Sequence, residues 1–297
     1  MLDDGGEGLQ LGEVAAPHYA RSTTDYARNI ADYPGVRRCL ASGQRSRRRF
    51  RHEPVFRKAH PGHGRDQRHR PGRGATHRRG RRPGHRDGAR PDRLAALRQA
   101  LPEAALVLRN DAADPGVARE LAEAVASGGG LDGAWLNAGY AAVCAIEAVD
   151  AEFFDAMMQA NLRGPVLQMA CLSSLLRPCG AVLLTGSTAA YEGSAMASVY
   201  AASKGAMLSL ARCWATALGP RGIRVNTLVP GPIDTNFRDF MADSFRRDFE
   251  AGVLGRLALS RMGRDEEAAA VALFLLSEEA GFVTGGQYAV DGGLAMR

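Results

Sequence analysis

Tyr200 and Lys204 are residues whose types and spacing could do chemistry. They stand four positions apart in a segment with helical character, so their side chains share one face of a helix. A phenol has a free pKa of about 10, and a neighbouring ammonium stabilises the phenolate and lowers that pKa. Such a pair could move a proton to or from a carbonyl or hydroxyl oxygen. Ser187, thirteen residues before Tyr200, could hydrogen-bond the same oxygen.

The spacing alone is a weak signal, because a surface tyrosine and lysine on an amphipathic helix give the same pattern. Lysine usage favours the catalytic interpretation. The chain has two lysines, Lys58 and Lys204, and every other cation from residue 91 onward is arginine. Lysine carries a compact charge with a tunable pKa, which arginine does not. An isolated lysine in this segment therefore indicates that an ammonium is needed at position 204.

Short apolar strands and longer helical segments alternate from residue 91 onward, and this alternation must position the candidate residues. The sequence predicts strands at 104–111, 131–139, 181–187, 223–231 and 286–293. It predicts helices at 91–101, 114–127, 151–162, 198–218 and 265–277, a second helical stretch from 163 to about 176, and a mixed loop at 236–263. Asp114 and Asp150 are expected helix N-caps. The pattern is typical of an α/β, doubly wound parallel sheet of Rossmann type, in which ligands bind beyond the carboxyl ends of the strands.

Residues 1–90 have a different composition from the rest of the chain. They hold 21 Lys and Arg against 9 Asp and Glu, whereas residues 91–297 hold 17 against 23. Residues 45–90 contain 16 Arg and 6 His among many Gly and Pro. Apolar residues are too few there to offset the entropy of ordering, so we expect a disordered or non-native basic segment. We place the boundary of the folded domain near Pro91.

The cysteines show no metal-ligand or redox spacing, so no metal site is expected; they are Cys39, Cys144, Cys171, Cys179 and Cys213. No apolar run is long enough to span a membrane. The first residues lack the basic start and apolar middle of a signal peptide. A cytoplasmic location is therefore expected.

Residues 91–297 resemble the short-chain dehydrogenase/reductase family, in its form with a single Rossmann domain. The matching motifs occur in family order: "ND" at 110–111, "NAG" at 137–139, Asn161 in "MMQANLRG", Ser187, "YAASK" at 200–204, "PGPIDT" at 230–235 and "FVTGGQYAVDGG" near the end. Each motif alone is unspecific, and an Asn-Gly-rich turn such as "NAG" is commonplace. Together and in order they are a strong signal.

The resemblance implies an NAD(P)-dependent oxidoreductase that interconverts a secondary alcohol and a ketone by hydride transfer. It implies NADP or NAD as cofactor, a small alcohol or carbonyl compound as substrate, and a homo-oligomer, commonly a tetramer. Tyr200 would be the general acid/base, and Lys204 would lower its pKa and hold the nicotinamide ribose. Ser187 would orient the substrate oxygen, and Asn161 would support a water-mediated proton relay.

The resemblance also implies where the cofactor binds. Asp111 and Ala112 would lie next to the adenine. The floor of the site would be formed by Asn137, Ala138 and Gly139. The residues against the nicotinamide would be Pro230, Gly231, Ile233 and Thr235. The substrate itself is not identified by these motifs.

The main departure from the family lies upstream, where residues 45–90 contain no apolar strand followed by a glycine loop. Such glycines let the backbone approach a pyrophosphate at a helix N-terminus. Read one base later, the codons of residues 60–71 permit Ile-Leu-Val-Thr-Gly-Gly-Thr-Ser-Gly-Ile-Gly, and those of residues 84–90 permit Val-Thr-Val-Thr-Gly-Arg. GC-rich codons produce glycines in any frame, but they do not explain Thr, Ser and Ile at the required places. We therefore hypothesise that residues from about 52 to 90 are a shifted translation caused by one base lost or gained near Arg90.

Two other functions remain open from the sequence. The Arg-rich arm at 45–90 could bind a phosphate backbone and make the chain a nucleic-acid-binding protein. We do not favour this, because the frame hypothesis explains the arm and the rest of the chain is mildly acidic. The chain could also be an inactive remnant, since it lacks the family's first strand and glycine loop. In the shifted frame, the Gly-Arg at the end of the second strand would favour NADP, because arginine can pair with the 2′-phosphate.

Overall fold

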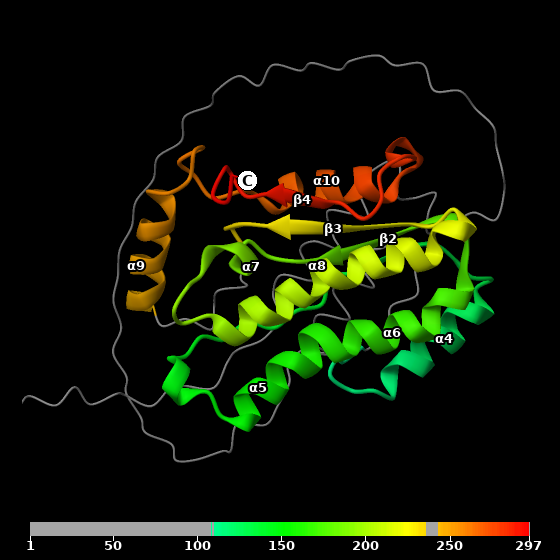
Figure 1. Cartoon of the computed structure of the whole chain (residues 1–297), viewed down its shortest axis with the longest axis horizontal. Coiled ribbons are helices and arrows are strands. Elements are labelled where there is room, and N and C mark those ends of the chain that lie inside the picture. The colour runs from blue at the N-terminus through cyan, green and yellow to red at the C-terminus, as the bar shows by residue number, and fades with distance from the viewer. Residues whose placement is uncertain (1–107, 109, 236–242, 297) are drawn as a thin grey trace, which may run out of the picture. The chain divides into compact units, whose positions relative to one another are not determined.

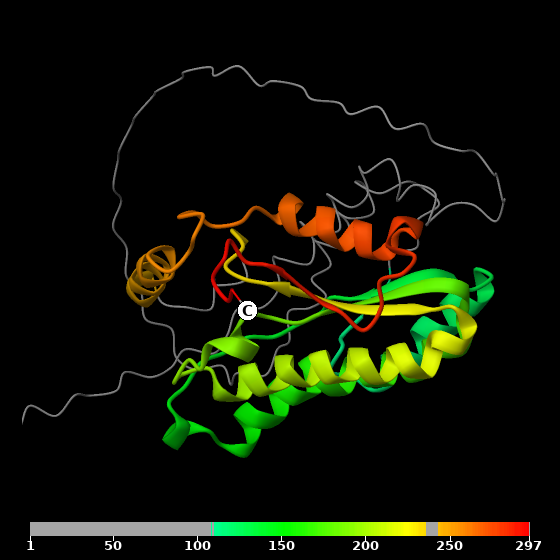
Figure 2. The ribbon, with the colours of Figure 1, turned by 45° about the horizontal axis from the view of Figure 1, so that its top comes forward.

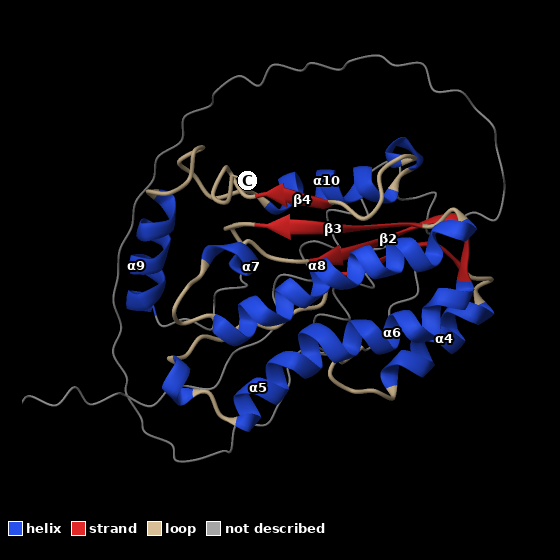
Figure 3. Cartoon of the chain, in the orientation of Figure 1, coloured by secondary structure: helices blue, strands red, loops and turns tan. Residues whose placement is uncertain are grey.

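The described strands form one parallel sheet. The computed structural model describes residues 108, 110–235 and 243–296, all of which fall in one of the two units into which the chain divides. The strands are β1 (Leu131–Leu136), β2 (Leu176–Thr185), β3 (Arg224–Pro230) and β4 (Gln287–Val290), paired side by side in that order (Figures 1 and 3). Every pairing is parallel, which confirms the predicted α/β architecture.

Helices cover both faces of this sheet (Figure 2). One face carries α5 (Ala151–Met158), α6 (Gly164–Leu172) and α8 (Ser198–Leu218), and α4 (Val117–Ser127) packs against α6. The opposite face carries α10 (Asp265–Leu276). Helices α7 (Ala189–Glu192) and α9 (Asp243–Leu254) lie at the end toward which the strand arrows point in Figure 1. Short turns of 3-10 helix occur at Ile146–Ala148, Ser173–Leu175, Gly219–Arg221 and Glu278–Ala280.

The core is divided by the sheet into two apolar clusters. Because successive side chains of a strand point to opposite faces, Val182 and Leu184 pack with Met207 of α8, whereas Leu183 packs with Leu275 of α10. These five side chains are fully buried. The central strand β2 is therefore apolar on both faces, as expected for a parallel sheet covered by helices.

Several sequence predictions of local structure are confirmed. Helix α8 has the predicted limits, and strands β1, β3 and β4 fall inside the predicted segments. Asp150 caps α5, because its Oδ1 accepts a hydrogen bond from the Phe153 N–H at 2.8 Å. Among the described residues, no helix combines the length and the apolar character that crossing a bilayer requires.

Other local predictions differ from the structure. Asp114 does not cap a helix: its Oδ1 accepts from the Gly116 N–H at 2.8 Å in a turn, so α4 begins only at Val117. The segment predicted as a mixed loop contains α9. The predicted helix at 91–101, most of the strand predicted at 104–111 and all of residues 1–90 lie outside the described residues.

Candidate active site

The carboxyl edge of the sheet brings three predicted site residues side by side. Beyond β2, the Gly186 N–H donates to Leu228 O at 2.8 Å and the Thr188 N–H donates to Pro230 O at 3.0 Å. Ser187 lies between these two bonds and is therefore held next to Pro230. Gly231 continues the edge, because its N–H donates to Val290 O of β4 at 3.0 Å.

Tyr200 and Lys204 lie in the first two turns of α8, facing the end of β2. The Ser187 and Tyr200 side chains are hydrogen-bonded to each other. Lys204 is buried, with 3% of its surface exposed, and its Nζ donates to Thr185 O at 3.1 Å. The fold thus brings together the hydroxyl, the phenol and the ammonium that the sequence singled out.

Burial controls the protonation of these groups. It raises the pKa of Tyr200 to about 12, and the hydrogen bond with Ser187 acts in the opposite direction. Burial also lowers the pKa of Lys204 to about 8. The sequence led us to expect that the ammonium would lower the pKa of Tyr200, and in this structure desolvation of the phenol is the larger effect. Tyr200 therefore holds its proton at neutral pH, as a proton donor must.

Asn161 lies in a π-helical turn, Gln159–Arg163, between α5 and α6. Such a turn inserts an extra residue into a helix and is frequent at functional sites. The Asn161 amide is 1% exposed; it accepts from the Tyr140 N–H and donates to Tyr140 O at 2.7 Å and to Ser203 Oγ at 2.9 Å. It therefore joins the turn after β1 to α8. With its side chain engaged in this way, Asn161 has a structural role beside any part in a proton relay.

The "NAG" turn lies beside Lys204. A Cβ atom at Gly139 would stand 3.0 Å from Lys204 Nζ, so glycine permits the close approach of the ammonium. Asn137 Oδ1 accepts from the Thr185 hydroxyl at 2.7 Å. Ala138 is exposed between these two residues. The three residues predicted for the floor of the site thus lie next to the predicted catalytic lysine.

The segment predicted to bind the adenine packs on the start of α6. A Cβ atom at Gly164 would stand 2.0 Å from Ala112 O, so this contact requires glycine. Arg163 Nη2 donates to Ala113 O at 2.8 Å, and Asp111 Oδ1 accepts from the Ala113 N–H at 3.0 Å. Asp111 and Ala112 are partly buried. Their position is therefore fixed by the residues that follow Asn161.

The loop after β3 is fixed by a bridge to the segment before α10. The Asp234 N–H donates to Gly263 O at 2.7 Å, and the Gly263 N–H donates to Pro232 O at 3.0 Å. Ile233 was predicted to contact the nicotinamide, but its side chain is 6% exposed and packs in the core with α10. Thr235 is partly buried and directly precedes the undescribed residues 236–242.

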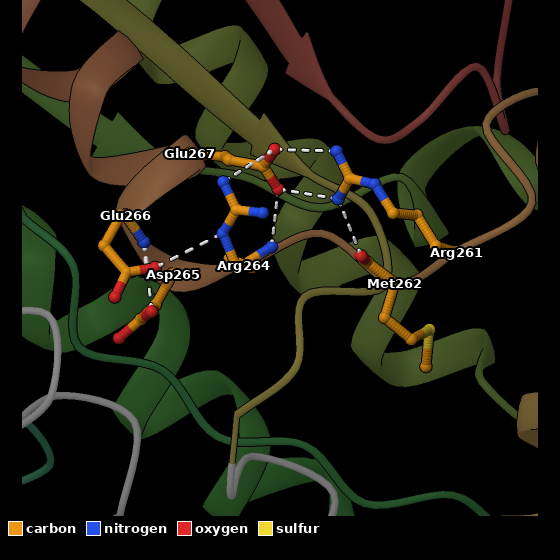
Figure 4. A network of polar contacts seen from close by, with 6 residues as sticks. All are labelled: Arg261, Met262, Arg264, Asp265, Glu266 and Glu267. Carbon is orange, nitrogen blue, oxygen red and sulfur yellow. Dashed lines mark hydrogen bonds and ion pairs between the residues drawn. The ribbon is translucent and has the colours of Figure 1, made fainter. Parts of the chain in front are cut away.

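A polar network around Glu267 holds the other side of that bridge (Figure 4). Glu267 accepts from both terminal nitrogens of Arg261, at 2.7 and 2.9 Å, and from the Arg264 N–H at 2.8 Å. Arg261 also donates to Met262 O at 3.0 Å. The hydrogen bonds from Arg261 lower the pKa of Glu267 to about 2. Residues 261–264 are thereby anchored to the start of α10, and the loop after β3 is anchored to them.

Sequence reasoning missed several residues that build the site. Arg163 and Gly164 position the Asp111 segment, and Glu267 fixes the loop after β3. Trp135 donates to the Thr185 hydroxyl, which in turn donates to Asn137, and the Thr185 main-chain oxygen accepts from Lys204. The sequence shows Arg163 and Gly164 shortly after Asn161, but it does not show that they contact the distant segment at Ala112 and Ala113.

Comparison with known proteins agrees with this arrangement. A family model described as Enoyl-(Acyl carrier protein) reductase matches residues 85–295. The Inactive 2-(S)-hydroxypropyl-CoM dehydrogenase 2 of Xanthobacter autotrophicus is 36% identical over 182 residues, which are 60% of this chain and 79% of that protein.

Solved structures give the same result. A short-chain dehydrogenase/reductase from Serratia marcescens superposes with a TM-score of 0.65 and 30% identity, covering 70% of this chain and 85% of the other. A short-chain dehydrogenase from Burkholderia cenocepacia in complex with NADP gives a TM-score of 0.63 and 30% identity, covering 69% of this chain and 83% of the other. The chain belongs to the short-chain dehydrogenase/reductase family of oxidoreductases.

Proposed function

We propose that this protein interconverts a secondary alcohol and a ketone by hydride transfer, with NADP or NAD as cofactor. One observation carries the proposal: Ser187, Tyr200 and Lys204 meet at the carboxyl edge of the sheet. There Ser187 is hydrogen-bonded to the phenol, and the ammonium is anchored on Thr185 O. Oxidoreductase relatives, among them the NADP complex from Burkholderia cenocepacia, support the choice of cofactor.

The residues at this edge fit a nicotinamide dinucleotide. An ammonium has three N–H donors, so after the bond to Thr185 O the Lys204 group retains donors for the ribose hydroxyls. Any larger residue at position 139 would crowd that ammonium, because a Cβ atom there would stand 3.0 Å from Lys204 Nζ. We assign the adenine end of the cofactor to Asp111 and Ala112, whose segment is held by Arg163 and Gly164. When bound, the cofactor would supply or accept the hydride.

The protein residues would perform the proton chemistry. In the reducing direction, Tyr200 donates its hydroxyl proton to the carbonyl oxygen, and the Ser187 hydroxyl donates a hydrogen bond to the same oxygen. The Lys204 ammonium stabilises the phenolate that remains, and this stabilisation offsets the burial that otherwise opposes ionisation. Positioned proton transfer of this kind contributes about 10²- to 10⁴-fold in rate. In the oxidising direction the same groups act in reverse.

The proposal is tested by comparing two tyrosine variants. We expect Tyr200→Phe to lower carbonyl-dependent oxidation of NADPH by about 10²- to 10⁴-fold. Tyr288→Phe changes a partly buried tyrosine of β4 in the same way and should leave the rate within about twofold, since only the phenol of Tyr200 is asked to donate a proton. Equal losses in the two variants, or no loss in either, would contradict the assignment.

We also propose that the missing nucleotide-binding loop is encoded in another frame, with residues 91–297 forming an incomplete Rossmann domain. The family match begins at residue 85, so residues 1–84 are unmatched. At the same time, the chain covers 85% of the Serratia marcescens protein, so part of that fold has no counterpart here. Resequencing the locus tests this: the hypothesis requires GAC codons at Asp66 and Asp87 and CAC at His63. A GAT codon at Asp66 would place isoleucine in the loop and contradict it.

The frame proposal also separates an active enzyme from an inactive remnant. If a frame-corrected chain binds NADPH and the unaltered chain does not, the unaltered chain is a remnant whose catalytic edge is intact. If both bind, the glycine loop encoded in the other frame is not required for binding. If neither binds NADPH or NADH, the proposed function is wrong.

We propose that the protein assembles as a homo-oligomer. Phe274 of α10 is 41% exposed and Phe282, which follows it, is fully exposed. Both lie near β4, which pairs within the described part of the chain only with β3. Light scattering after size exclusion should give a mass above that of one chain, and Phe282→Asp should reduce it. A monomeric unaltered protein would contradict this assignment.

A further inference from the structure

A short chain of hydrogen bonds runs across the ends of β1 and β2. The Trp135 Nε1–H donates to Thr185 Oγ1 at 2.8 Å, and the Thr185 hydroxyl donates to Asn137 Oδ1 at 2.7 Å. The Trp135 and Asn137 side chains both hydrogen-bond Thr185 Oγ1, so they lie on the same side of the sheet edge. Thr185 ends the neighbouring strand, one residue after the paired positions Leu136 and Leu184. The three side chains therefore connect in one direction, from the indole to the amide.

The indole fixes the direction of the first of these two hydrogen bonds. An indole N–H can only donate, so Thr185 Oγ1 must be the acceptor at that end. The Thr185 hydroxyl donates its own proton to Asn137, and in this arrangement the amide presents its oxygen to Thr185. The Asn137 Nδ2 group is consequently turned away from Thr185, and within the described residues it has no acceptor. Two N–H donors are thus presented at the carboxyl edge of the sheet.

Thr185 also positions the catalytic lysine. Its main-chain oxygen accepts from Lys204 Nζ at 3.1 Å, while its side chain holds Asn137. Gly139, two residues after Asn137, lies against the same ammonium. The donors of the Asn137 amide and of the Lys204 ammonium are therefore set from a single residue at the end of β2. Both sets of donors suit oxygen acceptors of a ribose or a phosphate.

We infer that Trp135 and Thr185 are positioning residues that hold the Asn137 amide with its NH₂ group facing the dinucleotide. This inference rests on the proposed function. Without the Thr185 hydroxyl the amide could turn over, and its oxygen would then face the ligand's acceptor oxygens. Because a net neutral hydrogen bond contributes about 0.5–1.5 kcal/mol, loss of this orientation should weaken NADPH binding about three- to tenfold.

The test uses three substitutions and two readouts. Thr185→Val removes the hydroxyl at nearly constant shape, Thr185→Ser keeps it, and Trp135→Phe removes the indole donor. The first readout is the indole N–H resonance of Trp135 in the ligand-free protein, assigned by its absence in Trp135→Phe. The second is the Kd for NADPH, measured with Trp214→Phe of α8 as the matched tryptophan control. Both are measured in the full chain, or in the frame-corrected chain if only that form binds.

We expect Thr185→Val to shift the Trp135 indole resonance and to raise the Kd for NADPH about three- to tenfold. Thr185→Ser should retain both properties, and Trp135→Phe should weaken binding while Trp214→Phe does not. The inference is overturned if Thr185→Val binds as tightly as the unaltered protein, or if the indole resonance does not move. If neither the chain as given nor the frame-corrected chain binds NADPH or NADH, the proposed function itself is wrong. The inference, which rests on it, is then wrong too.

Discussion

Replacing Asn161 with leucine removes the amide that joins the turn after β1 to α8. The amide accepts from the Tyr140 N–H and donates to Tyr140 O and Ser203 Oγ. Leucine has a similar size, so the main loss is of hydrogen bonds rather than of packing. The position is 1% exposed, which means that water cannot take over the role of the amide without a local opening.

The magnitude follows from the groups left without a partner. A buried polar group that loses its hydrogen bond costs about 1–3 kcal/mol. Two main-chain groups of Tyr140 are affected, and this residue is partly buried, so the cost per group falls in the lower part of that range. We therefore expect Asn161→Leu to lower the free energy of unfolding by about 2–4 kcal/mol.

Asn226 offers a matched control. It is also 1% exposed, and its amide likewise bridges two main-chain groups, donating to Val283 O at 2.8 Å and accepting from the Gly286 N–H at 3.0 Å. Asn226→Leu should therefore cost a similar free energy of unfolding. It lies inside β3, away from the carboxyl edge, so residual NADPH binding by the folded protein should be unchanged. Asn161→Leu should weaken that binding as well.

The assay is urea unfolding at equilibrium, with the NADPH Kd measured well below the unfolding midpoint. An unchanged slope of the unfolding free energy against urea concentration would show that both variants expose the same surface area on unfolding. The reasoning is refuted if Asn161→Leu costs less than about 0.5 kcal/mol, the range of an ordinary surface substitution. It is also refuted if the two variants weaken NADPH binding equally.

Three further predictions concern single side chains. Arg224 donates to two main-chain oxygens at the C-terminus of α10, each at 2.8 Å, so Arg224→Met should lower the free energy of unfolding by about 2–4 kcal/mol; a thermal transition unchanged from that of the unaltered protein would contradict this. Gly139→Ala places a methyl group 3.0 Å from Lys204 Nζ, so the turnover rate should fall about ten- to a hundredfold while the thermal transition barely moves; equal turnover would show that the ammonium is not displaced. The pKa of Glu267, about 2 in the folded protein, lies below the unfolded value of about 4.3. Its stabilisation is therefore complete above the unfolded pKa and is lost as the pH falls toward 2. Glu267→Gln should flatten the dependence of the unfolding free energy on pH in this window. If the unfolding free energy still falls with decreasing pH as it does in the unaltered protein, the role of the carboxylate is refuted.

Much of the fold could be predicted because its signals are local. The run of apolar residues around Leu183 predicts a buried strand, and the helical spacing of apolar residues around Met207 predicts a helix with one buried face. Asp150 caps the helix that directly follows it. Asp114 shows the limit of such reasoning. Its carboxylate satisfied the Gly116 N–H within a turn, a competing local hydrogen bond that residue type alone does not exclude. Helix α9 was missed because its charged residues obscure the apolar period.

The motifs of the site could be predicted from the sequence, but the residues that hold those motifs in place could not. Ser187, Tyr200 and Lys204 could be identified because each has a characteristic chemistry. Trp135 and Thr185 could not, because their contact joins residues fifty positions apart and each looks like an ordinary strand residue. The pKa of Tyr200 also depends on burial, which is set by packing rather than by neighbours in the sequence. Tertiary contacts therefore supply what spacing alone cannot.

The most direct measurement of the central claim is isotope transfer from the cofactor to the product. NADPH carrying deuterium at its transferable position is mixed with a ketone and with the chain form that binds it, and the alcohol is analysed by mass spectrometry. The account predicts one deuterium on the carbinol carbon, formed at a rate that falls about 10²- to 10⁴-fold in Tyr200→Phe. Alcohol formed without deuterium, or formed at an undiminished rate by Tyr200→Phe, would contradict it.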